Sequence, residues 1–165
     1  MSDAADLPAI LIAEDRAIIA AKIRRDLQQA GYAVAAVAGT IAEAEAAAQR
    51  LPIRGAVLDV DLRGEPVYSV AAILLARRLP FLFLTGYGRA ALPREWQGVP
   101  LLEKPFTGAA LSAALRRAMS GVRPAPLPRT VTTPTIRRAW DHMRHNRDLL
   151  TEQRAWTELH RAARG

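Results

Sequence analysis

Residues 9–15 read AILIAED, a short apolar run that ends in two carboxylates. The same arrangement recurs along the chain: Asp59 follows GAVL, Thr85 follows FLFL, and Lys104 follows PLLE. Short apolar runs of this kind are typical of buried parallel strands, whose carboxyl ends meet at one edge of the sheet and bind ligands there. The sequence therefore predicts one pocket that contains Glu14, Asp15, Asp59, Thr85 and Lys104.

The apolar runs alternate with Ala-rich stretches, which predicts an α/β fold with a doubly wound, five-stranded parallel sheet. Strands are expected near Ile10–Ala13, Ala33–Val37, Ala56–Leu58, Phe81–Leu84 and Leu101–Leu102. Helices are expected over Ala17–Ala30, after Thr40, from about Pro66, and after Thr107. Pro93 and Gly98 interrupt the segment ALPREWQGVP, so we expect a short or irregular helix there.

Two helix ends have clear signals. Gly31 follows the first helical stretch and is suited to a left-handed cap. Thr40 with Glu43 three residues later matches a capping box, in which each side chain bonds a free backbone N–H of the first turn. Pro52 prevents this second helix from continuing.

Three carboxylates in one pocket repel one another and require a cation if all are to stay ionised. Oxygen ligands without His or Cys nearby favour Mg²⁺ or Mn²⁺ over zinc, with Ca²⁺ as a weaker candidate. The hydroxyl of Thr85 and the ammonium of Lys104 are groups that hold phosphoryl oxygens. An aspartate can be a covalent nucleophile when a metal neutralises the incoming charge, so aspartyl phosphorylation is expected.

The chain resembles the receiver domains of bacterial two-component response regulators, which are CheY-like. The resemblance covers roughly residues 8–120 and rests on ILIAEDRAIIA, LDVDL, FLTGYG and EKPF in the family's order and spacing. It implies a flavodoxin-like sheet with strand order 2-1-3-4-5 and a phosphoacceptor that is not an enzyme beyond its own Mg-dependent phosphorylation and dephosphorylation. By resemblance, Asp59 accepts the phosphoryl group, and Thr85 and Lys104 bind its oxygens. The implied metal ligands are the carboxylates of Glu14, Asp15 and Asp59 and the backbone carbonyl of Asp61.

The resemblance also implies the partners and the switch. The phosphoryl donor would be a histidine kinase or a histidine phosphotransfer protein, and the output would be contact with a further protein. Family members commonly have Tyr or Phe three residues before the lysine, where this chain has Leu101. FLTGYG is similar to a Phe-x-Thr-Gly-Tyr-Gly subset of receivers, many of them single-domain, so Tyr87 is a candidate for the missing mobile aromatic group.

Several alternatives stay open at this point. The Asp61 side chain could be a fourth carboxylate at the metal, or it could face solvent. Haloacid-dehalogenase-like phosphatases use an Asp-x-Asp triplet like DVD, but in them the triplet follows the first strand, whereas here an acidic pair comes first. Each site residue alone could be an ordinary turn or helix-end residue. A receiver-fold interaction module that signals without phosphorylation is the main alternative function.

The chain divides by composition into a receiver domain (1–120), a Pro-rich linker (121–135) and a basic amphipathic tail (136–165). Residues 121–165 hold nine Arg and four acids, net +5 of the overall +7. The tail has Trp140 and Trp156, which favours contact with a protein, with the receiver or with a second copy of the chain. A homodimer could form through the tail or through the face of the last strand and its flanking helices. Direct DNA binding is disfavoured because no helix-turn-helix pattern is visible. His142 and His145 lack a third metal ligand.

The 165 residues are 50% apolar, enough for one well-buried domain with an appendage. The sequence has no cysteine, no leader pattern and no apolar run long enough for a membrane span. A cytoplasmic protein is therefore the expectation.

Overall fold

The computed structural model describes residues 7–121. These residues form two compact units. The first consists of residues 7–86 and 98–121, and the second contains residues 87–97. The predicted linker and tail lie outside the described residues except for Gly121, so the expected boundaries and the helical character of 136–165 stay predictions.

The first part is built on a five-stranded parallel sheet with the order β2-β1-β3-β6-β7. The strands are β1 (Ala9–Ala13), β2 (Ala33–Ala38), β3 (Gly55–Asp59), β6 (Phe81–Thr85) and β7 (Leu101–Glu103). Every residue of β3 and β6 is buried, as expected for central strands covered on both faces. The predicted fold class and the 2-1-3-4-5 order are both confirmed, because β6 and β7 are the fourth and fifth strands of this sheet.

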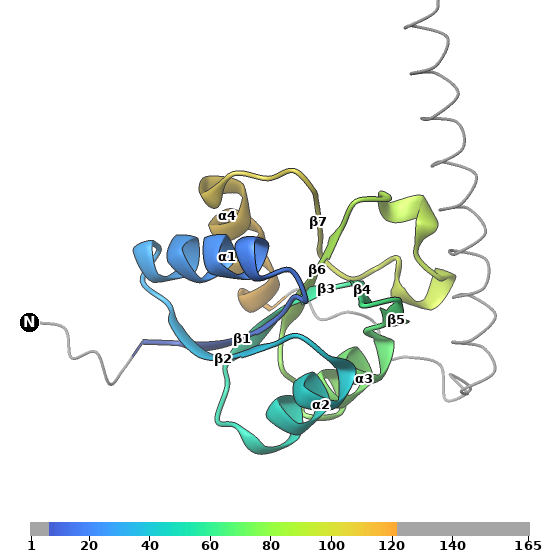
Figure 1. Ribbon diagram of the computed structural model, residues 1–165, viewed down its shortest axis with the longest axis horizontal. Helices are drawn as coiled ribbons and strands as arrows, with labels where there is room; N and C mark the ends of the chain where they lie inside the picture. The colour runs from blue at the N-terminus through green and yellow to red at the C-terminus, as the bar shows by residue number, and fades with distance from the viewer. Residues whose placement is uncertain (1–6, 122–165) are drawn as a thin grey trace, which may run out of the picture. The chain divides into compact units, whose positions relative to one another are not determined.

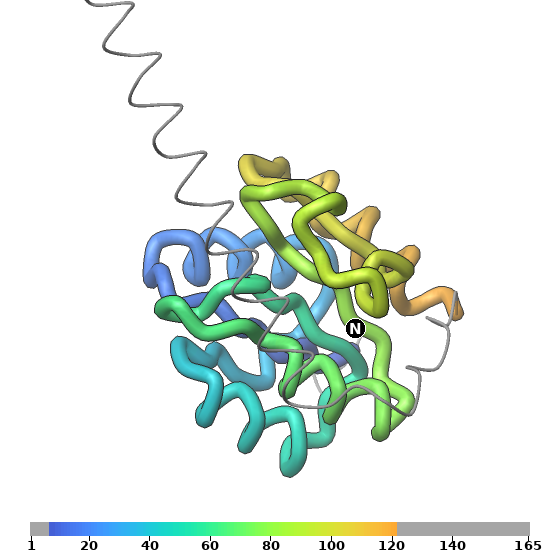
Figure 2. Tube along the Cα trace, turned by 90° about the vertical axis from the view of Figure 1, so that its right-hand side faces the viewer, coloured from blue at the N-terminus to red at the C-terminus, as the bar shows by residue number. Residues whose placement is uncertain are grey.

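Four helices cover the sheet: α1 (Ala17–Gln29), α2 (Ile41–Arg50), α3 (Tyr68–Ala76) and α4 (Gly108–Met119). Helices α1 and α4 lie on one face, and α2 and α3 lie on the other (Figure 1). The view in Figure 2 shows the same layers from the side. Between the sheet and the α1 and α4 face lies an apolar core that includes Ile12, Ile23, Leu27, Leu82 and Leu111. This packing fixes the strand ends that carry the polar residues.

The helix ends follow the sequence signals. Gly31 follows α1 with φ +86°, a left-handed conformation that glycine adopts without strain. Thr40 caps α2, and its hydroxyl accepts a hydrogen bond from the Glu43 N–H at 3.3 Å. Glu43 Oε2 in turn accepts from the Gly39 N–H at 2.9 Å, one residue before the cap. That N–H is the main reason why the pKa of Glu43 lies below its ordinary value.

A small hairpin after β3 was not predicted. It pairs β4 (Asp61–Leu62) with β5 (Glu65–Pro66) through a turn of Arg63 and Gly64, whose φ angles are 54° and 87°. Two positive φ angles in a two-residue loop are typical of a tight hairpin turn. The predicted start of the third helix at about Pro66 is therefore wrong: Pro66 pairs with Asp61, and α3 begins at Tyr68.

The segment 87–97 contains two single turns of 3-10 helix, η2 (Arg89–Ala91) and η3 (Arg94–Trp96). Pro93 separates them and has no N–H with which to continue a helix. The Gln97 side-chain amide donates to the Leu92 carbonyl at 3.1 Å, and the Arg89 guanidinium donates to the Gln97 carbonyl. The expected irregular helix is confirmed. Within residues 7–121, no helix has the length and apolar character needed to cross a membrane.

Candidate functional site

Three carboxylates converge where β1 and β3 end. Glu14 and Asp15 follow β1, and Asp59 is the last residue of β3, its neighbour in the sheet. One carboxylate oxygen from each lies within 4.8 Å of the others. Glu14 and Asp59 are buried, at 2% and 8% exposure. The predicted acidic cluster is therefore formed, and two of its members are shielded from water.

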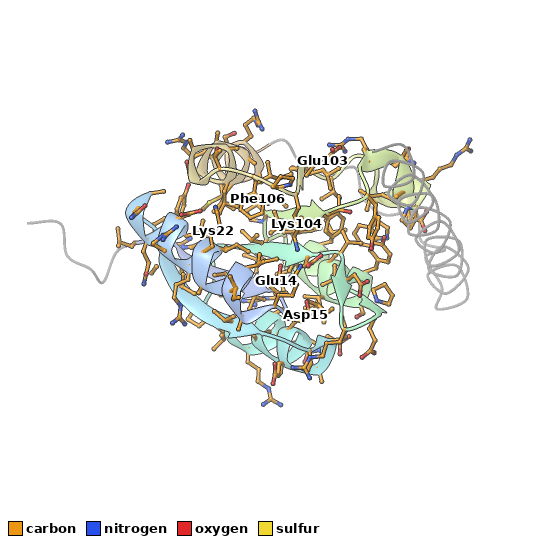
Figure 3. The ribbon with its side chains drawn as sticks, turned by 45° about the horizontal axis from the view of Figure 1, so that its top comes forward. Glu14, Asp15, Lys22, Glu103, Lys104 and Phe106 are labelled. Carbon is orange, nitrogen blue, oxygen red and sulfur yellow. The ribbon has the colours of Figure 1, made fainter. Side chains whose placement is uncertain are left out.

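Lys104 reaches into this cluster from the strand end of β7. Its Nζ lies 2.8 Å from Glu14 Oε2 and 2.6 Å from Asp59 Oδ2, so one ammonium bridges two carboxylates. Figure 3 shows the Lys104 side chain directed toward Glu14. The Lys104 N–H donates to the Thr85 carbonyl at 2.8 Å, which ties this backbone to the end of β6. The peptide bond from Lys104 to Pro105 is cis.

The negative charge of the carboxylates in the cluster exceeds the positive charge that Lys104 supplies. The pKa of Asp59 is raised to about 7, chiefly by burial and in smaller part by Glu14, although Lys104 and the Asp61 N–H act to lower it. Burial alone would lower the pKa of Lys104, but the Asp59 and Glu14 carboxylates outweigh it and raise that pKa. Lys104 thus stays charged, yet a single ammonium shared by two acids does not offset the cost of burying Asp59. Further positive charge would stabilise the ionised cluster.

Backbone N–H groups orient all three carboxylates. The Arg16 N–H donates to Glu14 Oε1 at 3.0 Å, and the Asp61 N–H donates to Asp59 Oδ1 at 3.3 Å. The Arg63 N–H, in the hairpin turn, donates to Asp15 Oδ2 at 3.3 Å. No role for Arg63 could be predicted, because a hairpin with two-residue strands is too short to show a periodic pattern.

The Asp61 side chain serves the hairpin. Its Oδ1 accepts from the Gly64 N–H at 2.7 Å, across the turn. Among the described residues, the cluster of converging carboxylates comprises Glu14, Asp15 and Asp59, without Asp61. This geometry favours the interpretation in which only the backbone of Asp61 takes part at a metal, although the side chain caps the turn and does not simply face solvent.

Thr85 lies at the same edge of the sheet. It is the last residue of β6, is 2% exposed, and pairs with Glu103, the residue before Lys104. The two candidate switch residues are Leu101, partly buried in β7, and Tyr87, which is 38% exposed. Tyr87 belongs to the second unit, in the segment 87–97. Its role as the mobile aromatic group stays a prediction.

The donor set fits a hard divalent cation. It offers carboxylate oxygens only, and the chain has no cysteine, while its three histidines all lie beyond residue 121. Such ligands suit Mg²⁺ or Mn²⁺, which prefer oxygen and retain waters. A cation beside Asp59 would also favour the ionised form of this carboxylate, whose pKa is raised chiefly by burial.

Sequence reasoning missed a second group of residues beside the site. On α1, Lys22 Nζ lies 2.5 Å from Asp26 Oδ2 and 4.7 Å from the centre of the Phe106 ring. Phe106 lies two residues after Lys104, and Figure 3 shows Lys22 and Phe106 together. The spacing of Lys22 and Asp26, four residues apart on a helix, could have predicted their ion pair but not the contact with Phe106.

Comparison with solved structures shows many similar chains. SdrG from Sphingomonas melonis Fr1 is 34% identical over 70% of this chain and 98% of its own, with a TM-score of 0.62. A response regulator receiver protein from Sinorhizobium medicae WSM419 is 28% identical over 72% of this chain and 98% of its own, with a TM-score of 0.62. The signal receiver domain of a modulated diguanylate cyclase from Desulfovibrio desulfuricans G20 is 30% identical over 70% of this chain and 95% of its own, with a TM-score of 0.60. No family model and no curated protein matches the chain.

Proposed function

Because this chain belongs to the response-regulator receiver family, we propose that it is a phosphoacceptor that takes a phosphoryl group onto Asp59 and signals through contact with another protein. The proposed donor is a histidine kinase or a histidine phosphotransfer protein. The downstream partner would recognise the phosphorylated state, and a compartment shared with the kinase makes the cytoplasm the proposed location. We propose no turnover of other substrates, so the protein would not be an enzyme in the ordinary sense.

One observation carries the proposal. Lys104 Nζ bridges Glu14 and Asp59 at 2.8 and 2.6 Å, within a cluster of three carboxylates. A lysine and a hydroxyl beside a cation-binding carboxylate set form an arrangement that can hold a tetrahedral dianion against an aspartate. No purely structural requirement explains an acidic cluster buried at the end of two central strands, because burying charge is costly.

The residues have distinct parts in the transfer. An Asp59 carboxylate oxygen forms a bond to phosphorus while the bond from phosphorus to the imidazole nitrogen of the donor breaks. The electron pair of that bond stays on the imidazole, which leaves as the neutral ring because its second nitrogen carries a proton. Lys104 then moves from the carboxylates to a phosphoryl oxygen, and the Thr85 hydroxyl donates to another. The N–H of Asp61 keeps the Asp59 side chain oriented throughout.

A divalent cation completes the proposed site. Glu14, Asp15 and Asp59 would hold it with their carboxylates, and Asp61 with its backbone carbonyl. When bound, Mg²⁺ or Mn²⁺ supplies positive charge that offsets the carboxylates and the incoming phosphoryl oxygens. The burial of Glu14 and Asp59 makes this compensation effective, because little water screens it.

The test is incubation of the full chain with Mg²⁺ and acetyl phosphate, followed by intact mass spectrometry. We expect a single phosphoryl adduct on the wild type that is lost under mild alkali, and none on Asp59→Asn, which keeps the shape of the side chain. Glu45→Gln is the matched control: it removes a carboxylate of the same domain from α2, which carries none of the site residues, and should leave the adduct in place.

An unmodified wild type that is folded and binds Mg²⁺ would contradict the proposal. The result would then have to be repeated with histidine kinases as donors. Failure there as well would favour a receiver-fold interaction module that works without phosphorylation. Multiple turnover of small phosphate esters would instead indicate a phosphatase.

A further inference from the structure

The turn that follows Lys104 is held by α1. Phe106 lies under the Lys22 ammonium, which is 4.7 Å from the ring centre, within the range of a cation–π interaction. The same ammonium pairs with Asp26 Oδ2 at 2.5 Å, one helical turn further along α1. Lys22 therefore links the turn carrying Lys104 to a buried carboxylate of α1.

Asp26 reaches the other side of the same turn. It is 8% exposed, and a Cβ built on Gly108, the first residue of α4, would lie 3.0 Å from Asp26 Cγ and 3.2 Å from its Oδ2. A side chain at this position would require the Asp26 carboxylate to shift by a few tenths of an ångström. The close approach of α1 to the start of α4 thus favours glycine at position 108. We name Lys22, Asp26, Phe106 and Gly108 the α1 clasp.

From this geometry we propose that the α1 clasp positions Lys104 for phosphoryl transfer, a role that rests on the function proposed above. The Lys104 backbone is fixed upstream by its N–H bond to the Thr85 carbonyl at 2.8 Å. Downstream, the clasp fixes Phe106 and Gly108, two and four residues later. Lys22 and Asp26 are positioning residues, since they act on the site through Lys104.

The transfer itself creates the need for such a fixed turn. The Lys104 ammonium must leave two carboxylates that now hold it at 2.8 and 2.6 Å and follow the phosphoryl group. A long side chain can make that move accurately only if its backbone stays in place, and small errors of placement slow a reaction strongly. An α1 residue thereby affects chemistry on β3 without touching the reacting atoms.

The test compares phosphorylation rates of full-length variants at saturating Mg²⁺ and at a temperature where each is fully folded. Lys22→Met keeps an apolar stem over Phe106 but removes the ammonium, and we expect the rate with acetyl phosphate to fall about fivefold to tenfold. Lys22→Arg should restore most of the rate, because a guanidinium can pair with Asp26 and stack on the ring. Arg25→Gln is the matched control: its Nε lies 3.7 Å from the same Asp26 carboxylate, so it removes a neighbouring cation.

Gly108→Ala is a second variant that does not weaken the helix. Alanine favours the first turn of α4, yet its Cβ would push the Asp26 carboxylate away. We expect slower phosphorylation with Mg²⁺ affinity unchanged. A loss of stability alone would not produce that combination.

A readout independent of phosphorylation is hydrogen exchange of the Lys104 amide, measured by NMR. The clasp variants should exchange this amide faster than the wild type and Arg25→Gln. If the wild type is phosphorylated and Lys22→Met and Gly108→Ala react at its rate, the clasp has no positioning role. If the wild type is not phosphorylated at all, the proposed function fails and with it the role of the clasp in phosphoryl transfer, and hydrogen exchange then decides only whether the clasp fixes the Lys104 backbone: faster exchange in the variants supports this, and unchanged exchange overturns it.

Discussion

Asp59 is a buried carboxylate with two opposed neighbours. Lys104 favours its charge from 2.6 Å, whereas Glu14, bound to the same ammonium, disfavours it. The net effect of burial and of these neighbours is a pKa of about 7, so Asp59 is only partly ionised at neutral pH. A nucleophile must be ionised when it reacts, and a cation or a repositioned lysine would complete that ionisation. In the proposed function, a bound cation would therefore prepare Asp59 to accept the phosphoryl group.

The role of the Asp61 side chain can be tested by substitution. Asparagine at this position can still accept the Gly64 N–H through Oδ1, so Asp61→Asn should keep the hairpin while removing one negative charge. Because this side chain is turned to the hairpin, we expect the Mg²⁺ dissociation constant, measured by calorimetry, to change by less than about threefold. Asp15→Asn, which removes a member of the cluster, should weaken Mg²⁺ by more than about tenfold.

The contribution of the Asp61 side chain to the hairpin can be tested with Asp61→Ala. Removing the acceptor of the Gly64 N–H should lower the free energy of unfolding by about 1 kcal/mol, measured by urea denaturation. A large loss of Mg²⁺ affinity in Asp61→Asn with unchanged stability would show instead that the carboxylate is a metal ligand.

At the scale of elements, the helix caps set the stability around the site. Thr40 accepts from the Glu43 N–H at 3.3 Å, and Thr107 accepts from the Ala110 N–H at 3.1 Å, at the starts of α2 and α4. We expect Thr40→Ala to lower the free energy of unfolding by about 1 kcal/mol in urea denaturation. The phosphorylation rate of the folded variant should not change, because α2 carries none of the five site residues. A slowed reaction would show that α2 takes part in aligning the site.

The strands and helices could be predicted because each has a local cause. FLFL and GAVL are buried on both faces and read as unbroken apolar runs, and Thr40 and Gly31 mark helix ends by their own chemistry. The location of the site could be predicted from the strands, because the carboxyl ends of parallel strands meet at one edge of the sheet. The 61–66 hairpin could not be predicted in this way, because each of its strands has only two residues. The α1 clasp depends on how closely α1 approaches α4, which a single sequence does not reveal.

At the scale of the whole molecule, the predicted site is complete within the described residues. Glu14, Asp15, Asp59, Thr85 and Lys104 all belong to the part made of residues 7–86 and 98–121. A chain ending at Gly121 should therefore take up the phosphoryl group at a rate within about twofold of the full chain, with the adduct measured by mass spectrometry. A folded truncated chain that is not phosphorylated would show that the basic tail contributes to the acceptor site.

We expect Asp59 also to make the stability of the molecule depend on pH and on divalent metal together. The pKa of Asp59 rises from 3.8 to about 7 on folding, so between these values the unfolded chain has released a proton that the folded chain retains. The free energy of unfolding in EDTA must then fall as pH rises through this window, by about 1.4 kcal/mol at most for each pKa unit, and the Asp59 contribution is fully present only below about pH 4.

Mg²⁺ should reverse this trend, because a cation beside Asp59 stabilises the ionised form. We expect Mg²⁺ to raise the melting temperature more at pH 8 than at pH 5, measured by calorimetry against EDTA, since at pH 5 the ion must displace a proton. In Asp59→Asn the contribution of this residue to the pH slope in EDTA should vanish, and the Mg²⁺ effect should become weaker and less dependent on pH. Equal stabilisation of the wild type by Mg²⁺ at both pH values would mean that the ion binds without Asp59, away from the cluster at the ends of β1 and β3.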